Sequence, residues 1–471
     1  MMRFKPDSNL IFTCKDVDDL LAKNGEKLLT FFNLHRDQQR PRLQELLDYY
    51  LTNNRGINKR EGRDEPYADY RIAHAFVKNG TDFIRGYIGG NEITFRDDKY
   101  NEEIQNINDL NDAHVTNVEI LEDCIIYGRA YEIVYRNTDN QDIFKRLDPK
   151  NVFVIYSNDI EVEPVAAVRY RSEKINGKDV TLIDLYTASY RAYFYIDDNR
   201  LIARRDMPQE VNMHQMLQIH EYNANRFRQG VFENVLDLID AYDYAESDTA
   251  NYMTDLNDAM LKIEGHLDLK LEEVKKMRKS RIILAKTKAD ASGRMGNANV
   301  DFIYKQYDVA GVEAYKKRIQ KDIHKFTNTP DLSDENFGGV QSGEAMKYKL
   351  FGLEQLRSTI ERQLTKGFKR RFAIIQSVRN QLNDPIDLSH MRIEYKPNIP
   401  QSLSEYADIF IKLGGRVSQE TLLSWLPNIE NPKEELEKVK AEEQEASENH
   451  DYHDAMTVQQ EKADINNVEL E

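Results

Sequence analysis

The spacing of hydrophobic positions divides this chain into helical and strand-like stretches. In its first quarter the apolar side chains recur every three or four positions, which predicts helices over about 16–60, 70–90 and 102–127. Gly128 follows the third of these, as glycine commonly does at a helix C-terminus. The N-terminal part of the chain is therefore expected to be mainly helical.

The period changes to two in the middle of the chain. Apolar and polar residues alternate from about 131 to 196, and Asn176-Gly177 separates the runs 165–175 and 180–186. Asn-Gly favours a two-residue hairpin turn, so this region is expected to be a β-meander. Five tyrosines in it are candidates for base stacking, but their strand preference favours sheet positions at a subunit contact: Tyr170, Tyr186, Tyr190, Tyr193 and Tyr195.

Helical spacing then returns together with an unusual run of negative charge. The predicted helix covers 231–262, and no Lys or Arg occurs between Gln229 and Leu261. Its carboxylates are the first candidate functional group: Asp237, Asp240, Asp243, Glu246, Asp248, Asp255 and Asp258. Its apolar positions form a seam at spacings of three and four: Leu238, Tyr242, Ala245, Thr249, Tyr252, Leu256 and Met260.

An all-acidic helix of this length repels itself and should have a basic partner. The second helix of this part, 308–327, supplies one through Lys316, Lys317, Lys321 and Lys325. Each helix alone is equally compatible with a solvated charged face. The complementary charges favour a packed helical hairpin, formed within one subunit or between two.

Two other segments adjoin the hairpin. The first, 263–307, is expected to be a small mixed module whose candidate contact residues are Arg281, Ile283, Arg294 and Phe302. The second, 328–343, is a polar loop that is long for a compact domain, and such loops are usually functional or disordered. Its candidate functional residues are Asp331, Ser333, Asp334, Glu335, Asn336, Phe337, Gly338, Gly339 and Gln341.

The longest predicted helix opens at Glu344 and runs to about Leu382, where Gly352 and Gly367 favour a bend. It carries a basic cluster for which ion pairs with acidic neighbours are favoured over contact with DNA: Lys366, Lys369, Arg370 and Arg371. A helical unit follows over 400–471. It ends in a Glu-rich stretch that is expected to be mobile beyond about residue 445.

Composition narrows the class of protein. The chain has 471 residues, a formal net charge of −16, 40% hydrophobic residues, 31% charged residues and a mean hydropathy of −0.70. This length indicates two to four domains, and the low apolar content favours elongated helices covered by neighbouring subunits. The acidic balance argues against a tight grip on DNA phosphates. No apolar run reaches the roughly 20 residues of a membrane helix, so no membrane association is expected.

Motifs for catalysis and cofactors are not found. The sequence contains no GxxxxGK[ST], GxGxxG, HExxH or GxSxG, and its densest carboxylate cluster has no neighbouring His or Cys. Cys14 and Cys124 lie far apart, which argues against a disulfide framework or thiolate metal site and favours a reducing compartment. His450 and His453 are typical of a solvated tail rather than of a metal site. No enzyme activity, cofactor or metal is predicted.

Several segments in a fixed order resemble a known family. The chain resembles the portal proteins, or head-to-tail connectors, of tailed double-stranded DNA bacteriophages, of the siphophage type. The resemblance extends over almost the whole chain and is carried by residues 71–74, 86–91, 126–132, 245–256, 304–309, 323–330 and 342–350.

This resemblance implies an α+β, mainly helical portal fold that assembles as a dodecameric ring. The implied parts are a wing over 1–230 with a long kinked wing helix and return over 344–399, a stem made of 231–262 and 308–327, a clip over 263–307, a channel loop over 328–343, and a crown over 400–471. A ring of twelve would carry roughly −190 formal charges, and carboxylates lining its bore would repel phosphate. The loop lacks Lys and Arg, so any grip on DNA would be steric or through backbone amides and Asn336.

The implied function is a channel at one capsid vertex through which double-stranded DNA is packaged and ejected. The implied partners are the large terminase subunit, the head-completion adaptor and the major capsid and scaffolding proteins. The implied locations are the portal vertex of the virion and, during assembly, the host cytoplasm. The alternative is another head–tail interface or packaging accessory protein, either an adaptor ring or a terminase-associated factor. An adaptor is disfavoured by this chain's length.

Overall fold

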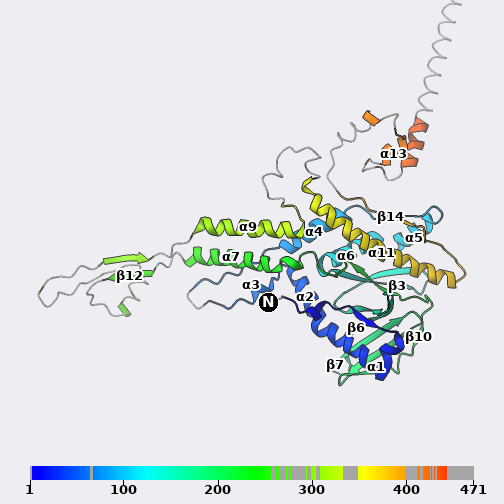
Figure 1. Ribbon diagram of the computed structural model, residues 1–471, viewed down its shortest axis with the longest axis horizontal. Helices are drawn as coiled ribbons and strands as arrows, with labels where there is room; N and C mark the ends of the chain where they lie inside the picture. Colours follow the sequence, from blue (N-terminus) through cyan, green and yellow to red (C-terminus); the bar gives the residue numbers. More distant parts are fainter. Residues whose placement is uncertain are drawn as a thin grey trace, which may run out of the picture. The chain divides into compact units, whose positions relative to one another are not determined.

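The chain consists of two units, 1–398 and 399–471. The computed structural model describes residues 3–63, 67–175, 177–255, 260–264, 272–273, 276, 293, 299–303, 308–331, 348–398, 411–413, 417–424, 426, 429 and 432–442. Helices and strands are mixed throughout the first unit, in agreement with the predicted α+β class (Figure 1). In the second unit the described elements are α13 (Gln419–Ser424) and helical stretches over 411–413 and 432–442.

The predicted N-terminal helices are present but interrupted. The elements are η1 (Pro6–Asn9), β1 (Phe12–Cys14), α1 (Val17–Leu34), η2 (His35–Gln39, a π-helical turn), α2 (Arg40–Tyr50) and α3 (Arg55–Asn58). The Asp16 side chain accepts a hydrogen bond from Asp19 N and so caps α1. Within α1 the backbone leaves the helical region at Ala22–Gly25, where Lys23, Asn24 and Gly25 have positive φ.

Two of the predicted helix boundaries are wrong. The helix expected from residue 70 begins only at Phe76, giving α4 (Phe76–Gly89), because residues 70–75 are extended along another helix. The helix expected over 102–127 is two helices, α5 (Asn101–Leu110) and α6 (Ala113–Tyr127). Between them the Asn111 side chain donates to Asp142 O and accepts from Phe144 N, and Asp112 is left-handed. These bonds to a strand hold the break in place.

The predicted meander is divided between two sheets: its part before residue 148 joins a smaller sheet, and the part from residue 152 forms most of the larger one. The larger sheet has the order β1-β5-β6-β7-β8-β10 with β9 beside β8, and all its pairs are antiparallel except β1–β5. Its remaining strands are β5 (Val152–Ser157), β6 (Pro164–Ile175), β7 (Lys178–Thr187), β8 (Tyr190–Asp197), β9 (Arg200–Ala203) and β10 (Glu210–Val211). Ile175 pairs with Lys178 across the Asn-Gly turn, where Gly177 has φ +78°, so the predicted hairpin is confirmed.

The larger sheet has a hydrophobic core on each face. On one face Leu20, Leu28 and Phe32 of α1 pack against Phe153 and Val168. On the other, Val154 and Tyr186 pack against a smaller sheet of order β11-β3-β4, whose strands are β11 (Ile219–Asn223), β3 (Arg129–Arg136) and β4 (Asp142–Leu147). The N-terminal helix and the two sheets therefore form successive layers (Figure 1).

The long helix α11 (Phe351–Gln381) packs on the smaller sheet and ends within one residue of its predicted end. A Cβ atom at Gly367 would lie 2.1 Å from Tyr222 Cδ1, so only glycine lets this β11 ring approach the helix so closely. The fully buried Arg371 of α11 forms two hydrogen bonds to the fully buried Glu132 of β3. After α11, β14 (Arg392–Glu394) pairs with β2 (Thr94–Arg96).

The helical hairpin is shorter than predicted. After η3 (Glu233–Val235), α7 covers Leu236–Asp255, and residues 260–262, which were expected to be helical, belong to strand β12 (Met260–Glu264). β12 pairs antiparallel with β13 (Asn299–Ile303), and α9 (Val309–Thr327) follows. α7 and α9 lie side by side (Figure 1). The predicted pairing of these two helices is thus present within one chain.

His35 gives the N-terminal layer a predictable sensitivity to acid. Burial lowers the pKa of His35 to about 3, against about 6.5 in an unfolded chain, and its ring stacks on Phe153 at 4.9 Å. The buried neutral ring therefore contributes its full stabilisation above pH 6.5. As the pH falls toward 3 this contribution is lost, and at pH 5 the free energy of unfolding is already lower by about 2 kcal/mol.

Replacing His35 by phenylalanine should remove this share of the acid sensitivity. Tyr170 O–H still donates to Lys150 O in that variant, so no hydroxyl is left without a partner. Denaturant unfolding at pH 7.5 and pH 5 should show about 2 kcal/mol less loss in His35→Phe than in the parent protein. An equal loss in both proteins would contradict the assignment.

Candidate functional site

An extended segment, 67–75, runs along the acidic helix α7 and is fixed to it by a ladder of hydrogen bonds. Four alternate backbone N–H groups donate to four side chains of α7: Ala68 to Asp255 Oδ1 at 3.0 Å, Tyr70 to Asn251 Oδ1 at 2.6 Å, Ile72 to Ser247 Oγ at 2.9 Å, and His74 to Asp243 Oδ1 at 3.0 Å. The extended segment and α7 are therefore antiparallel.

The ladder works because two backbone repeats nearly coincide. Two residues of extended chain advance about 6.6 Å, and four residues of α-helix advance about 6 Å. Every second N–H therefore meets every fourth side chain. Asp243, Ser247 and Asn251 are buried, so the most buried face of this part of α7 is polar, whereas the described positions of the predicted apolar seam are only half-buried.

Apart from Glu246, the other acidic side chains of α7 contact cations in the N-terminal part of the chain. Arg3 contacts Asp240 at 2.7 Å and Asp237 at 2.8 Å, and it also binds Glu45. Further along the helix, Arg60 contacts Asp248 at 2.5 Å and Arg63 contacts Asp255 at 2.8 Å. The N-terminal 74 residues therefore neutralise most of the acidic helix, a role that no pattern in their sequence indicates.

Both carboxylate oxygens of Asp243 have hydrogen-bond partners in the N-terminal part of the chain. Its side chain is fully buried, Oδ2 accepts from Asn54 Nδ2 at 2.6 Å, and Oδ1 lies 2.8 Å from His74 Nδ1 in addition to the backbone bond. The His74 ring also meets Tyr242 edge to face at 4.7 Å. Asp243 thus joins α7 to two separate places in the N-terminal part.

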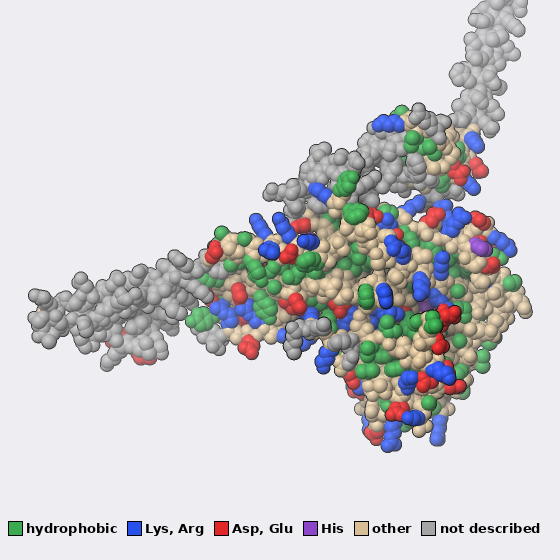
Figure 2. Space-filling model, in the orientation of Figure 1, with side chains coloured by type: hydrophobic (Ala, Val, Ile, Leu, Met, Phe, Trp, Pro, Cys, Tyr) green, Lys and Arg blue, Asp and Glu red, His purple; other side chains and the backbone are tan. Residues whose placement is uncertain are grey.

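The expected charge pairing between α7 and α9 is confirmed at one lysine. Lys316 is buried and contacts Glu246 of α7 at 3.0 Å and Glu313 of its own helix at 2.5 Å. Lys317, Lys321 and Lys325 are exposed and form no ion pair among the described residues. Figure 2 shows Lys and Arg side chains gathered over α9. Within the described part of one chain, the basic face of α9 is therefore mainly unpaired.

The predicted channel loop leaves α9 through a well-fixed turn. Asn328 ends the helix with φ +56°, Thr327 and Thr329 are buried, and their hydroxyl oxygens lie 2.8 Å apart. Thr329 N donates to His324 O, and His324 Nε2 lies 3.9 Å from Asp331 Oδ1. Burial lowers the pKa of His324.

Other predicted site residues lie outside the described residues: Ser333, Asp334, Glu335, Asn336, Phe337, Gly338, Gly339, Gln341, Asp258, Arg281, Ile283 and Arg294. Phe302 lies in β13, opposite Leu261. The tail beyond residue 445, predicted to be mobile, is also outside the described part of the chain.

Comparison with known proteins decides the family. A family model described as "Phage portal protein, SPP1 Gp6-like" matches residues 30–449. The chain belongs to this portal protein family. A similar curated relative is the portal protein of Bacillus phage SPP1, which is 22% identical over 403 residues, covering 80% of this chain and 77% of the relative. The family resemblance drawn from the sequence is thereby confirmed.

Membership in the portal family implies an oligomeric ring that associates with a viral capsid and DNA, and a structural role. Among the described residues no helix has both the length and the apolar character needed to cross a membrane. The same residues contain no cluster of three or more His, Cys, Asp or Glu side chains that could hold a metal ion.

Two of the four basic side chains in the α11 cluster form ion pairs. Arg371 binds Glu132, as described above, and Arg370 lies 3.9 Å from Glu163. Lys366 and Lys369 form no ion pair among the described residues. The preference for ion pairs over DNA contact is confirmed at Arg371, because its side chain is fully buried.

Proposed function

We propose that twelve copies of this portal-family chain form a ring at one vertex of a phage capsid, and that double-stranded DNA is packaged and ejected through it. The family match over residues 30–449 carries this proposal. The proposed partners are the large terminase subunit, the head-completion adaptor, and the scaffolding and major capsid proteins. The ring assembles in the host cytoplasm and remains at the portal vertex of the virion.

In this proposal α7 and α9 form the stem and β12–β13 belongs to the clip. β12 follows α7 and β13 precedes α9. Their antiparallel pairing supports this division, because it brings the end of α7 and the start of α9 to the same two-stranded sheet. The wing is 1–230 with the long helix of 344–399, the channel loop is 328–343 and the crown is 400–471. DNA passes without covalent chemistry, and the loop contacts it sterically or through backbone amides.

The exposed lysines of α9 fit a contact between neighbouring subunits. Because the α7 carboxylates already have partners within the chain, reversing Lys317, Lys321 and Lys325 to Glu should leave the free energy of unfolding within about 1 kcal/mol of the parent value. The same variant should assemble into rings less readily, which light scattering measures. Unchanged assembly would exclude these lysines from the subunit contact.

Deletion of residues 333–339 tests the proposed channel. Purified parent protein and deletion variant should both give rings with a central hole in negative-stain electron microscopy, because the loop root at Thr327–Thr329 is anchored in α9. In infected cells the variant should yield few DNA-filled heads. Normal filled heads would remove the loop from the mechanism, and small particles without rings from the parent protein would contradict the ring itself.

A further inference from the structure

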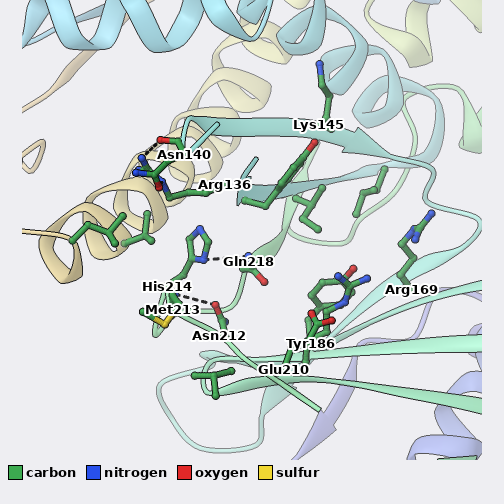
Figure 3. A pocket seen from close by; sticks show the side chains of 17 residues that line it. Arg136, Asn140, Lys145, Arg169, Tyr186, Glu210, Asn212, Met213, His214 and Gln218 are labelled. Atoms are coloured by element: carbon green, nitrogen blue, oxygen red, sulfur yellow. Dashed lines mark hydrogen bonds between the residues drawn. The ribbon is translucent and has the colours of Figure 1, made fainter. Parts of the chain in front are cut away.

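A cationic pocket of about 660 Å³ opens between the two sheets near the end of α11 (Figure 3). The smaller sheet contributes Arg136, which also pairs with Asp142 at 2.7 Å, and Lys145. The larger sheet contributes Arg169 and Arg191. Glu210 is the one acidic residue in its described lining. The pocket therefore favours an occupant that carries negative charge.

The positive charge of the larger-sheet wall is only partly balanced within the chain. Asp184 is nearly fully buried and faces three guanidinium groups, those of Arg169 at 3.4 Å, Arg171 at 2.9 Å and Arg191 at 3.5 Å. Arg171 also binds Glu173 at 2.7 Å, so two carboxylates face three cations and one positive charge is in excess. On the opposite wall, Lys145 is exposed and forms no ion pair among the described residues.

The lining of the pocket is also unusually apolar for a charged surface. Val211, Met213 and Leu382 line it and rank among the exposed large hydrophobic side chains of the protein, at 78%, 56% and 40% exposure. Figure 3 shows Met213 close to His214 and Asn212. Clustered exposed apolar side chains commonly mark a protein interaction site. A segment combining apolar side chains with carboxylates would match this surface.

Such a segment projects from the same protein. The loop between β5 and β6, 158–163, has the sequence Asn-Asp-Ile-Glu-Val-Glu, in which Ile160 is fully exposed and Val162 is 59% exposed. Its three carboxylates alternate with the two apolar side chains and are themselves exposed. Ile160 and Val162 therefore present apolar surface flanked by carboxylates.

The loop is held in shape before any partner binds. At its base Ser157 N donates to Glu163 O at 2.7 Å, and Asn158 N donates to Cys14 O of the edge strand β1 at 3.0 Å. Within it, Asp159 N donates to Ser157 Oγ at 3.1 Å. A preorganised loop loses little conformational entropy on docking, which favours binding.

We propose that loop 158–163 of one subunit docks in the Arg136–Arg191 pocket of its neighbour, with Ile160 against the apolar lining and the carboxylates beside the cations. This inference rests on the proposed ring, since it names one contact that would build it. The loop leaves β5, next to the edge strand β1, whereas the pocket reaches β10 at the other end of the sheet order. Two different surfaces in contact give a head-to-tail interface, the kind that closes into rings.

Paired cysteines test the contact directly. Ile160→Cys combined with Met213→Cys should give a ladder of covalent multimers when the assembled protein is treated with a short bis-maleimide. The native thiols Cys14 and Cys124 are buried and should not react in the folded protein. The matched control is Ile160→Cys with Leu110→Cys, which places the second thiol at another exposed apolar position and should give no ladder.

A charge exchange supplies the second test. Glu161→Lys and Lys145→Glu should each raise the protein concentration needed for half-assembly about tenfold, and the two changes together should restore much of the loss. Rings in electron microscopy without the cysteine ladder would overturn this contact and leave the ring proposal intact. Absence of both rings and ladder would overturn the two together.

Discussion

Replacing Arg371 by methionine is expected to lower the free energy of unfolding by about 3–5 kcal/mol. The Arg371 side chain is fully buried, donates from Nε and Nη2 to Glu132, and donates from Nη2 to Asn117 Oδ1 at 2.8 Å. Its guanidinium also lies 3.9 Å from the centre of the Phe144 ring. The substitution leaves the Glu132 carboxylate buried without its cation, and this loss dominates the cost.

Two further variants separate the lost charge pair from a packing defect. Arg371→Met combined with Glu132→Gln removes the stranded charge while Tyr222 O–H keeps an acceptor, so the double variant should be more stable than Arg371→Met alone. Arg370→Met is the neighbouring control, because Arg370 lies 3.9 Å from an exposed Glu163, and it should cost less than about 1 kcal/mol. Denaturant unfolding of all three gives the comparison. A double variant no more stable than Arg371→Met would show that packing, and not charge, sets the cost.

Local signals in the sequence are sufficient wherever a short motif decides the structure. Asn176-Gly177 predicts the hairpin because few other dipeptides tolerate the turn that joins Ile175 to Lys178. Gly128 predicts the end of α6, and its φ of +81° explains why glycine stands there. The complementary charges of α7 and α9 predict that these helices pack together, as they do at Lys316 and Glu246.

Sequence patterns mislead where a distant segment competes with local preference. Residues 70–75 have a pattern that continues into α4 and predicts helix, but hydrogen bonds to α7 side chains hold this segment extended. Asp243, Ser247 and Asn251 recur at a spacing of four. That spacing is equally typical of a solvated helical face, and a single sequence cannot distinguish the two.

The partners of the acidic helix differ from the predicted ones for the same reason. Charge complementarity favours Lys317, Lys321 and Lys325, which lie on α9 but form no ion pair among the described residues. Arg3 stands alone, more than 230 residues before Asp237 and Asp240, and carries no pattern that would mark it as their partner. The N-terminal residues matter to the candidate stem because they neutralise its carboxylates, and this conclusion requires the structure.

Asp243 provides the second large expected effect, because it holds the acidic helix to the N-terminal segment. Asp243→Ala should lower the free energy of unfolding by about 3 kcal/mol, since it leaves His74 N without its acceptor and removes the shorter of the two hydrogen bonds of Asn54 Nδ2 in a buried place. The loss should also loosen the ladder, so the amide protons of Ile72 and His74 should exchange with solvent faster than in the parent protein.

The matched control is Asp248→Ala on the same helix. Asp248 is 58% exposed and its described partner is Arg60, so its removal should cost less than about 1 kcal/mol and leave both amides protected. Hydrogen exchange read by mass spectrometry over residues 67–75 separates the two variants. Equal protection in Asp243→Ala and the parent would mean that the neighbouring bonds to Ser247 and Asn251 hold the segment without Asp243. The ladder would then act as separate bonds and not as one cooperative unit joining α7 to residues 67–75.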